Sequence, residues 1–328
     1  MTAAYLVADL GATNARFALL NELSRWPSDA ASVRQVTLPT GAYGSAADLL
    51  NAARAELGFA ELAAACLAMA GPVIAGSGAS AQGRMTNSQL LLDTGALQSQ
   101  LACPVTLVND FAALARGVPQ ARDRLQIGGD PGAQGVIAVL GPGSGLGVSA
   151  LIPGEPWPQV LPSEGGHADL APGTPLEQEI LQLLSREHGT VSWETVLSGP
   201  GLVNLYRAMA ALWGVEPQEA SPEWVAEQGR LAGEPICHQT LETFFGFLGA
   251  AAGNLALTFA ARGGVFVAGG IVPALAEFAL TSPLRRRFEE RGELAEYVAS
   301  VPIWIILDAQ PGLVGALECL RQARAAER

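Results

Sequence analysis

A chain of 328 residues is longer than one compact core usually supports, so two domains are expected, and its 49% hydrophobic and 15% charged residues exclude a disordered protein. Its formal net charge of -12 argues against a nucleic-acid partner, because phosphate backbones select basic surfaces. All 19 basic residues are arginine, which excludes three classes that depend on a lysine: Walker-type phosphate loops, protein kinases and pyridoxal enzymes.

Neither a membrane span nor a secretory signal is expected. Gly, Asn or Arg interrupts each apolar run before it reaches membrane-spanning length, and the first residues lead into a strand without a basic region before it. The four cysteines are Cys66, Cys103, Cys237 and Cys319, and their wide spacing predicts reduced, buried thiols. We therefore expect a cytoplasmic protein.

The first third of the chain alternates strands with turns and helices. Apolar alternation predicts strands, and apolar residues at helical spacing predict one helix that ends at Gly58. The expected strands are residues 5–10, 16–20, 33–38, 65–69 and 105–108, and the helix is 46–57. This order predicts an α/β unit.

A glycine-rich turn joins the first two strands, and a similar turn occurs later in the chain. The first reads Asp9-Leu10-Gly11-Ala12-Thr13-Asn14, and the second, after a strand at 137–140, reads Gly143-Ser144-Gly145. Such turns bring consecutive N–H groups close to an anion, and Thr13 or Ser144 adds a hydroxyl. One copy alone is equally typical of an ordinary tight hairpin. Two copies with matching flanks favour a pair of turns that holds a polyphosphate.

The rest of the chain repeats the α/β pattern, so the fold is expected to be built twice. Helices are predicted at 175–188, ending at Gly189, at 199–213, and at 241–261 as a long apolar helix. A strand at 265–268 precedes Gly269-Gly270 and a further helix, and a late strand is expected at 301–307. The final amphipathic helix, 312–324, is expected to pack back on the first domain.

Asn109 and Asp110 directly follow a buried strand, where open α/β sheets place their ligands. An aspartate there can accept the proton of a hydroxyl while the neighbouring amide holds the substrate. From the dipeptide alone, however, the preferred interpretation is an N-cap of a helix that starts near Phe111.

A second set of polar residues lies on glycine-flexed loops of the later half. Glu164 and His167 share the loop Glu164-Gly165-Gly166-His167, and Glu194 follows in another loop. Carboxylates that each accept two hydroxyl donors suit a polyhydroxylated sugar. The alternative is a metal site, but the spacing of these residues is not that of metal ligands. Gly269-Gly270 is compatible with an adenosine contact and equally with close helix-to-strand packing.

Together these residues resemble bacterial glucokinases of the proteobacterial type, within the sugar kinase, Hsp70 and actin superfamily. The resemblance covers nearly the whole chain, and its order and spacing are specific. Its motifs are residues 9–16, Met85-Thr86-Asn87, 108–111, 143–147, 161–167, 196–206, 268–273 and Pro311-Gly312-Leu313.

The resemblance implies an α/β, two-lobed, ribonuclease H-like fold in which a mixed β-sheet with helices is duplicated about a central cleft. The small α/β domain would comprise residues 1–110 plus about 308–328, and the large one about 111–307. Glucose and ATP as substrates, Mg²⁺ and a homodimer are also implied. The net charge and the interrupted apolar runs separately predict that the chain binds no nucleic acid and no membrane.

By position, the resemblance makes Asp110 the base that accepts the proton of the glucose 6-hydroxyl. It makes Asn109, Glu164, His167 and Glu194 ligands of the other hydroxyls, together with Asp110. Leu10, Gly11, Ala12, Thr13 and Asn14 would form one phosphate turn, and Gly143, Ser144 and Gly145 the other. Asp9 would hold Mg²⁺ through water, and Gly269 and Gly270 would lie near adenosine.

Two positions depart from the family's pattern. Ala12 stands where glycine is usual, and if that position needs a positive φ, its Cβ costs about 1 kcal/mol or more. Ser144 replaces the commoner threonine and keeps the hydroxyl. We expect activity to survive both changes.

Other functions are compatible with the same residues. A kinase for fructose, mannose or an N-acyl amino sugar would use the same carboxylates, and ADP or polyphosphate could serve as the donor. A non-catalytic sugar sensor would be expected to lose the base or a phosphate turn, whereas this chain retains Asp110 and both turns.

Overall fold

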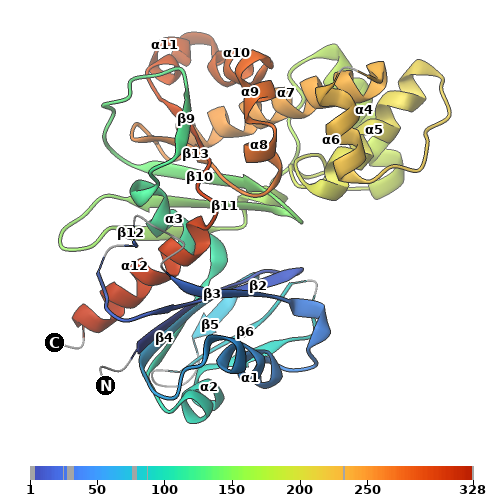
Figure 1. The fold of residues 1–328 in the computed structure, drawn as a ribbon. Helices are drawn as coiled ribbons and strands as arrows, with labels where there is room; N and C mark the ends of the chain where they lie inside the picture. Colours follow the sequence, from blue (N-terminus) through green and yellow to red (C-terminus); the bar gives the residue numbers. More distant parts are fainter. Residues whose placement is uncertain are drawn as a thin grey trace. The chain divides into compact units, whose positions relative to one another are not determined.

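The computed structural model describes residues 4–24, 26–27, 33–75, 80–86, 88–231 and 233–326. The chain forms two compact units, drawn in Figure 1. Unit 1 comprises Met1–Arg122 and Asp308–Arg328, and unit 2 comprises Asp123–Leu307. Unit 1 thus continues twelve residues beyond residue 110, since helix α3 (Asp110–Gly117) packs against the C-terminal helix of the same unit.

Unit 1 is built on a five-stranded mixed sheet whose order is β3-β2-β1-β4-β8. β1, β2 and β3 form an antiparallel meander, and β4 and β8 continue the sheet in parallel from β1. The bounds are β1 Ala4–Leu10, β2 Asn14–Leu20, β3 Arg34–Pro39, β4 Leu62–Met69 and β8 Val105–Asn109. This arrangement places the carboxyl ends of β1, β4 and β8 at one edge.

Helices cover both faces of this sheet because its apolar side chains alternate between the faces. Leu6 and Ala8 of β1 face the core that includes α1 (Ala46–Leu57) and α2 (Thr94–Leu101). Val7 faces the core that includes α3 and α12 (Pro311–Ala326). α1 has the predicted bounds, with Ser45 as N-cap and Gly58 in the left-handed conformation at its end.

A close crossing of α3 and α12 holds the final helix on unit 1. A Cβ on Gly117 would lie 2.8 Å from the Gly315 amide nitrogen, so both helices need glycine at the crossing. Beyond β4, a small antiparallel sheet was not predicted from the sequence. Its strands are β5 Val73–Ala75, β6 Ala81–Arg84 and β7 Leu91–Asp93.

Unit 2 repeats the strand pattern of unit 1, as predicted. Its sheet has the order β12-β11-β10-β13-β14-β9, in which β10, β11 and β12 form an antiparallel meander and β13 and β14 continue in parallel. The bounds are β9 Arg124–Ile127, β10 Ile137–Pro142, β11 Leu146–Ile152, β12 Gln159–Ser163, β13 Gly264–Val267 and β14 Ile303–Ile306. β9 adds an antiparallel edge strand to β14.

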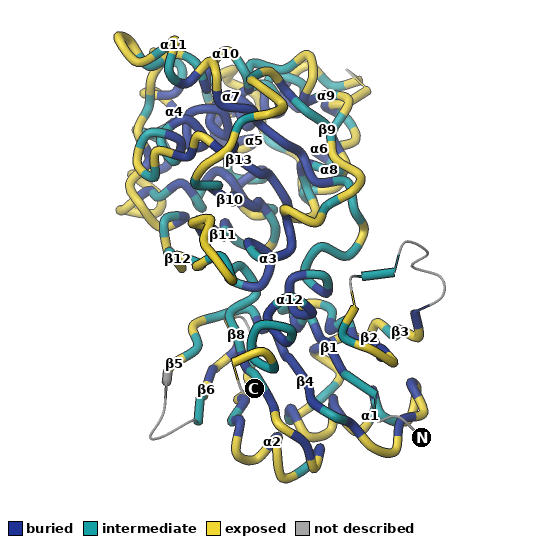
Figure 2. Tube along the Cα trace, turned by 90° about the vertical axis from the view of Figure 1, so that its left-hand side faces the viewer, coloured by how far each residue is buried: buried dark blue, intermediate teal, exposed yellow. Residues whose placement is uncertain are grey.

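The helices of unit 2 pack around a long central helix, α7, which is buried along most of its length in Figure 2. The helical bounds are α4 Pro175–His188, α5 Gly199–Trp213, α6 Pro222–Arg230, α7 Pro235–Thr258, α8 Ile271–Ala274, α9 Ala276–Thr281, α10 Leu284–Glu289 and α11 Ala295–Ala299. α4 and α5 have the predicted bounds. α7 begins six residues before the predicted start, because the Glu234 carboxylate caps it at the Cys237 N–H, 2.7 Å away.

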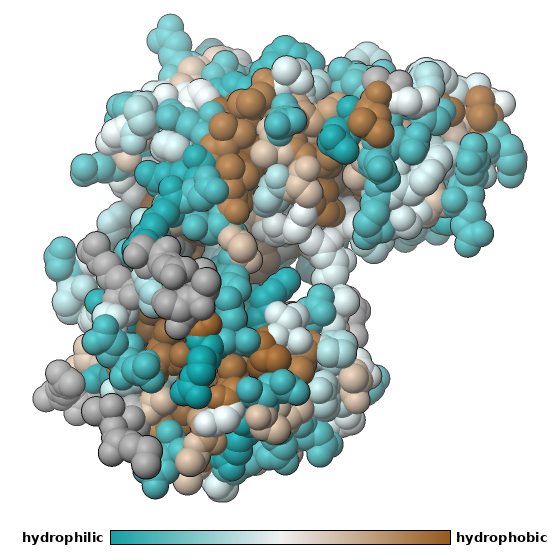
Figure 3. All heavy atoms as spheres, in the orientation of Figure 1, coloured by the Kyte–Doolittle hydropathy of each residue, from teal (hydrophilic) through white to brown (hydrophobic). Residues whose placement is uncertain are grey.

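The four cysteines are free, buried thiols, as predicted. Within the described ranges, no helix is both long enough and apolar enough to cross a lipid bilayer. On the face drawn in Figure 3, hydrophilic residues are spread over both units.

Candidate functional site

The first glycine turn is the tip of the β1–β2 hairpin. The Gly11 N–H donates to the Asn14 carbonyl at 3.0 Å, which closes the turn. Thr40, which is buried, holds the turn from below: its hydroxyl donates to the Gly11 carbonyl at 2.7 Å and its N–H to the Thr13 carbonyl at 2.9 Å. Thr13 itself is exposed. The turn is therefore held through its carbonyls, while the Thr13 hydroxyl faces solvent.

Ala12 does not strain this turn. Among the described non-glycine residues, positive φ angles occur at Ala102 and Ala260 only. Ala12 thus has no positive φ, and its Cβ does not carry the conformational cost that a positive φ would bring.

The Asp9 carboxylate lies beside the first turn and against the start of α12. Its Oδ2 is 3.6 Å from Nη1 of Arg16, its cross-strand partner on β2. Burial raises the pKa of Asp9, and the Arg16 guanidinium opposes that effect only in part. A Cβ on Gly312 would lie 2.5 Å from Asp9 Oδ2, so only glycine leaves room here for the carboxylate. The helix dipole stabilises a negative charge, such as that of Asp9, near the N-terminal turn of a helix.

Asn109 and Asp110 are organised as one hydrogen-bonded pair at the start of α3. Asn109 is the N-cap, and its Oδ1 accepts from the Ala112 N–H at 2.9 Å, so the capping interpretation is confirmed. Its Nδ2 also donates to Oδ1 of Asp110 at 3.0 Å and to the Gly71 carbonyl at 3.1 Å. The same Asp110 oxygen accepts from the Phe111 N–H at 2.9 Å. Capping and orientation of the carboxylate are therefore combined in one residue.

The Asp110 site and the first turn share one edge of the unit 1 sheet. Leu10 pairs with Met69 of β4, and Met69 pairs with Asn109 of β8. One strand separates them, which corresponds to about 10 Å across the sheet at ordinary strand spacing. Asp9, the first turn and Asp110 thus face the same side of unit 1.

The second glycine turn is the tip of the β10–β11 hairpin in unit 2. The Gly143 N–H donates to the Gly145 carbonyl at 2.8 Å, and the Gly143 carbonyl accepts from the Gly199 N–H at 2.8 Å. Gly199 is the first residue of α5, so the start of that helix lies against the turn. Ser144 is exposed at the tip.

The loops that carry Glu164, His167 and Glu194 surround this second turn. Glu194 Oε2 accepts from the Leu146 N–H at 2.7 Å, and its Oε1 lies 3.9 Å from His167 Nε2. The Glu194 N–H donates to the Gly166 carbonyl at 2.8 Å, which ties the two loops together. Glu164 and His167 are exposed. Glu194 and His167 therefore lie together beside the turn, and Glu164 lies on the same loop as His167.

Gly269 and Gly270 differ in their surroundings. Gly269 has a φ of +89° and its Cα lies directly against the Pro142 carbonyl, so close backbone packing accounts for this glycine. A Cβ added to Gly270 would meet no neighbouring atom within 4 Å, so the space beside this glycine is open. The packing interpretation therefore holds for Gly269, and Gly270 keeps room for a ligand.

Three features of the site were not recognised in the sequence: the support that Thr40 gives the first turn, the room that Gly312 leaves for Asp9, and the contact of Glu194 with Leu146. All three join residues far apart in the chain, and no local pattern marks them. Asn87 of the Met85-Thr86-Asn87 motif lies outside the described residues. In the described part of the chain, no group of three or more His, Cys, Asp or Glu residues could hold a metal ion.

Comparisons with known proteins agree on one family. The family model described as Glucokinase matches residues 6–323. A glucokinase of Saccharophagus degradans is 38% identical over 97% of this chain and 98% of its own length. The crystal structure of a glucokinase from an Antarctic psychrotroph is similar with a TM-score of 0.82 and 34% identity, covering 98% of this chain and 100% of that one. A ROK family glucokinase from Streptomyces griseus, solved in complex with glucose and AMPPNP, shares the fold with a TM-score of 0.66 at 21% identity, covering 97% of this chain and 99% of that one.

Proposed function

The chain belongs to the glucokinase family, and from this premise we propose which of its groups carry out the ATP-dependent phosphorylation of glucose. The transferred phosphoryl group would go to the 6-hydroxyl, with Asp110 as the general base. The observation that carries this assignment is the position of Asp110, at the same sheet edge as the first glycine turn and with one carboxylate oxygen held by two donors.

Asp110 is suited to receive a proton late in the transfer. Its Oδ1 is fixed by the Phe111 N–H and by the Asn109 side chain, so the carboxylate keeps one orientation toward the substrate. Phosphoryl transfer depends mainly on positioning and on neutralisation of charge. Asn109 therefore contributes first by orienting Asp110, and a contact of Asn109 with a sugar hydroxyl would be additional.

We assign the two glycine turns to the phosphates of ATP. Thr13 and Ser144 each present an exposed hydroxyl at a hairpin tip, next to backbone N–H groups. Donors that are already oriented before the reaction stabilise developing negative charge without reorganisation. Gly270, with open space beside it, remains the candidate contact for adenosine.

The residues around Asp9 fit an Mg²⁺ ion. Mg²⁺ commonly takes one or two carboxylates together with waters and substrate phosphates, rather than a cluster of protein ligands. Asp9 supplies a carboxylate beside the phosphate turn, and Gly312 leaves room for that carboxylate against the first turn of α12. When bound there, the ion would neutralise charge on the phosphates. Asp9 would hold it directly or through water.

Glu164, His167 and Glu194 are proposed to bind the remaining hydroxyls of glucose. Carboxylate oxygens accept hydroxyl donors, and Glu164 and His167 are exposed while Glu194 is half-buried. The family resemblance also supports a cytoplasmic homodimer, which we propose for this chain.

The proposal is tested by measuring ADP release from Mg-ATP with glucose, fructose, mannose or N-acetylglucosamine, for the wild type and for Asp110→Asn. Loss of a general base typically lowers kcat by roughly 10²- to 10⁴-fold. The matched control is Asp93→Asn, the same change at the N-cap of α2, where asparagine caps as well as aspartate.

Glucose-dependent turnover that falls in Asp110→Asn and persists in Asp93→Asn is the expected result. Turnover with another sugar alone would keep the mechanism and change the substrate. If Asp110→Asn retained the wild-type kcat, Asp110 would not be the base. Replacing ATP by ADP or polyphosphate in the same assay identifies the donor.

A further inference from the structure

One side chain connects the sugar-binding loops of unit 2 with the second phosphate turn. The two oxygens of the Glu194 carboxylate have different partners: Oε2 accepts from the Leu146 N–H at 2.7 Å, and Oε1 faces His167 Nε2 at 3.9 Å. Leu146 directly follows Gly145 at the turn. A single carboxylate therefore lies beside both sets of residues.

The contact with the turn is close and specific. A Cβ on Gly145 would lie 2.5 Å from Glu194 Oε2, so the carboxylate rests on the backbone of the turn itself. Hydrogen bonds from an N–H to a charged acceptor are roughly twice as strong as neutral ones. The position of the turn thus depends on the position of the Glu194 carboxylate.

The backbone of Glu194 reinforces this connection. Its N–H donates to the Gly166 carbonyl of the Glu164–His167 loop at 2.8 Å, and its carbonyl accepts from the Ser198 hydroxyl at 2.9 Å. Ser198 caps α5, whose first residue, Gly199, donates to the Gly143 carbonyl at 2.8 Å. Each end of the turn is therefore tied to the segment that carries Glu194.

We propose that Glu194 is a positioning residue that couples the occupancy of the sugar site to nucleotide binding at the second phosphate turn. The proposal rests on the proposed function. A glucose hydroxyl that donates to Oε1 of Glu194 restrains the carboxylate. Oε2 then holds the Leu146 N–H, and with it the second phosphate turn, in one place. Because glucose has already ordered the turn, less conformational entropy is lost when ATP binds to it.

Coupling of this kind is reciprocal and measurable. Glucose should tighten nucleotide binding by a factor of roughly 5 to 150, and the nucleotide should tighten glucose binding by the same factor. The factor is obtained by calorimetric titration of AMPPNP with Mg²⁺ into the intact chain, with and without saturating glucose.

Two substitutions at Glu194 separate its two contacts. Glu194→Gln keeps one oxygen for the Leu146 N–H and replaces the other by an NH₂ donor. Without glucose, this variant should bind AMPPNP with the wild-type affinity. When glucose is added, its affinity for AMPPNP should increase by a factor at least threefold smaller than in the wild type. Glu194→Asp is shorter and withdraws from the turn, so AMPPNP should bind more weakly even without glucose. The matched control is Glu164→Gln, because in the described part of the chain no hydrogen bond or ion pair joins Glu164 to the turn. It should weaken glucose binding and, once glucose saturates, leave the factor unchanged.

The inference is overturned if the factor by which glucose tightens AMPPNP binding is the same in Glu194→Gln as in the wild type. It is also overturned if Glu164→Gln lowers that factor as much as Glu194→Gln does. It is also overturned if Glu194→Asp binds AMPPNP alone as tightly as the wild type. A wild type that turns over glucose with a factor of one would remove the coupling and leave the proposed function intact. A wild type that binds no glucose would remove both.

Discussion

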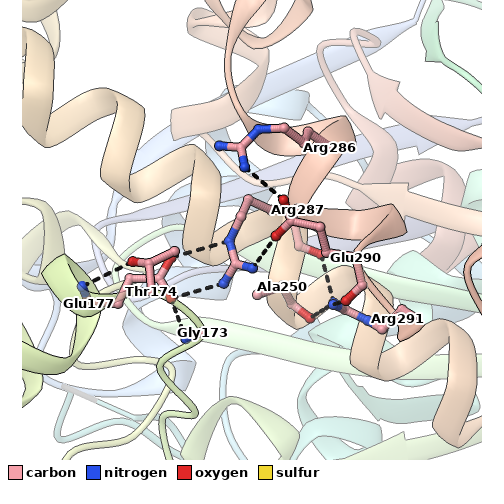
Figure 4. A network of polar contacts seen from close by, with 9 residues as sticks. Gly173, Thr174, Glu177, Ala250, Arg286, Arg287, Glu290 and Arg291 are labelled. Carbon is pink, nitrogen blue, oxygen red and sulfur yellow. Dashed lines mark hydrogen bonds and ion pairs between the residues drawn. The ribbon is translucent and has the colours of Figure 1, made fainter.

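Replacing Glu177 by alanine should destabilise unit 2 strongly, because this carboxylate is half of a buried ion pair. Glu177 is 4% exposed and Arg287 is 5% exposed. Arg287 donates to Glu177 through Nε at 3.2 Å and Nη2 at 2.9 Å, and the Gly173 N–H donates to the same carboxylate at 2.6 Å (Figure 4). The pair joins α4 to α10 across the interior of unit 2.

The magnitude follows from what Glu177→Ala would leave behind. Burial alone would lower the pKa of Arg287, but Glu290 and Glu177 raise it, so the guanidinium is charged. Removal of one partner of a buried pair costs about 3–5 kcal/mol. Arg287 would keep Glu290, at 2.6 Å from its Nη1, and that carboxylate is 41% exposed. We therefore expect the lower end of the range, about 3 kcal/mol.

The assay is urea unfolding followed by tryptophan fluorescence, since Trp193 and Trp224 report on unit 2. Arg286→Ala is the control: it removes an exposed pair with Glu290, worth about 0–1 kcal/mol. Replacing both partners together, Glu177→Leu with Arg287→Met, should recover much of the lost stability. A loss below about 1 kcal/mol in Glu177→Ala would refute the reasoning that the buried charge is the cause.

Two further predictions concern the first phosphate turn. Because the pKa of Asp9 is raised, the folded protein binds its proton more tightly than the unfolded chain, and the ionised form destabilises the fold above that pKa. Asp9→Asn should thus raise the Tm at pH 7 and lower kcat. The gain in Tm should shrink as the pH falls through the pKa of Asp9, because the wild-type carboxyl is then protonated too. An unchanged Tm at pH 7 would show that burial is not the main cause of the raised pKa. Ala12→Gly should leave the KM for ATP unchanged and lower the free energy of unfolding by about 0.4–1 kcal/mol, through the greater freedom of the unfolded chain. A lower KM for ATP in Ala12→Gly would mean that the Cβ does hinder the turn.

Local signals in the sequence were sufficient for much of the fold. α1, α4 and α5 begin and end at the predicted residues, because their apolar spacing coincides with caps and terminal glycines that act within a few residues. The repeated strand and glycine-turn pattern predicted the duplicated sheet, and both hairpins formed where expected. The start of α7 was predicted six residues too late, because Glu234 caps the helix ahead of the predicted apolar segment.

Strand pairing beyond the hairpins depended on distant residues. The β5–β6–β7 sheet was missed because its strands are three or four residues long and its register is set by tertiary packing, as where Gly83 lies against Met69 of β4. Strands of three or four residues are too short for their apolar pattern to fix a register.

For the site, the sequence by itself determined which chemical groups are available: the two glycine turns, Asp110 after a buried strand, and the carboxylates of the later loops. What only the tertiary structure decided is how these groups are held. Thr40 reaches the first turn from 27 residues beyond Thr13, Gly312 returns from the far end of the chain to make room for Asp9, and Glu194 binds an N–H 48 residues earlier. Residue types and spacing specify hydroxyls, carboxylates and flexible turns locally, whereas their mutual contacts arise only when the sheets and helices pack.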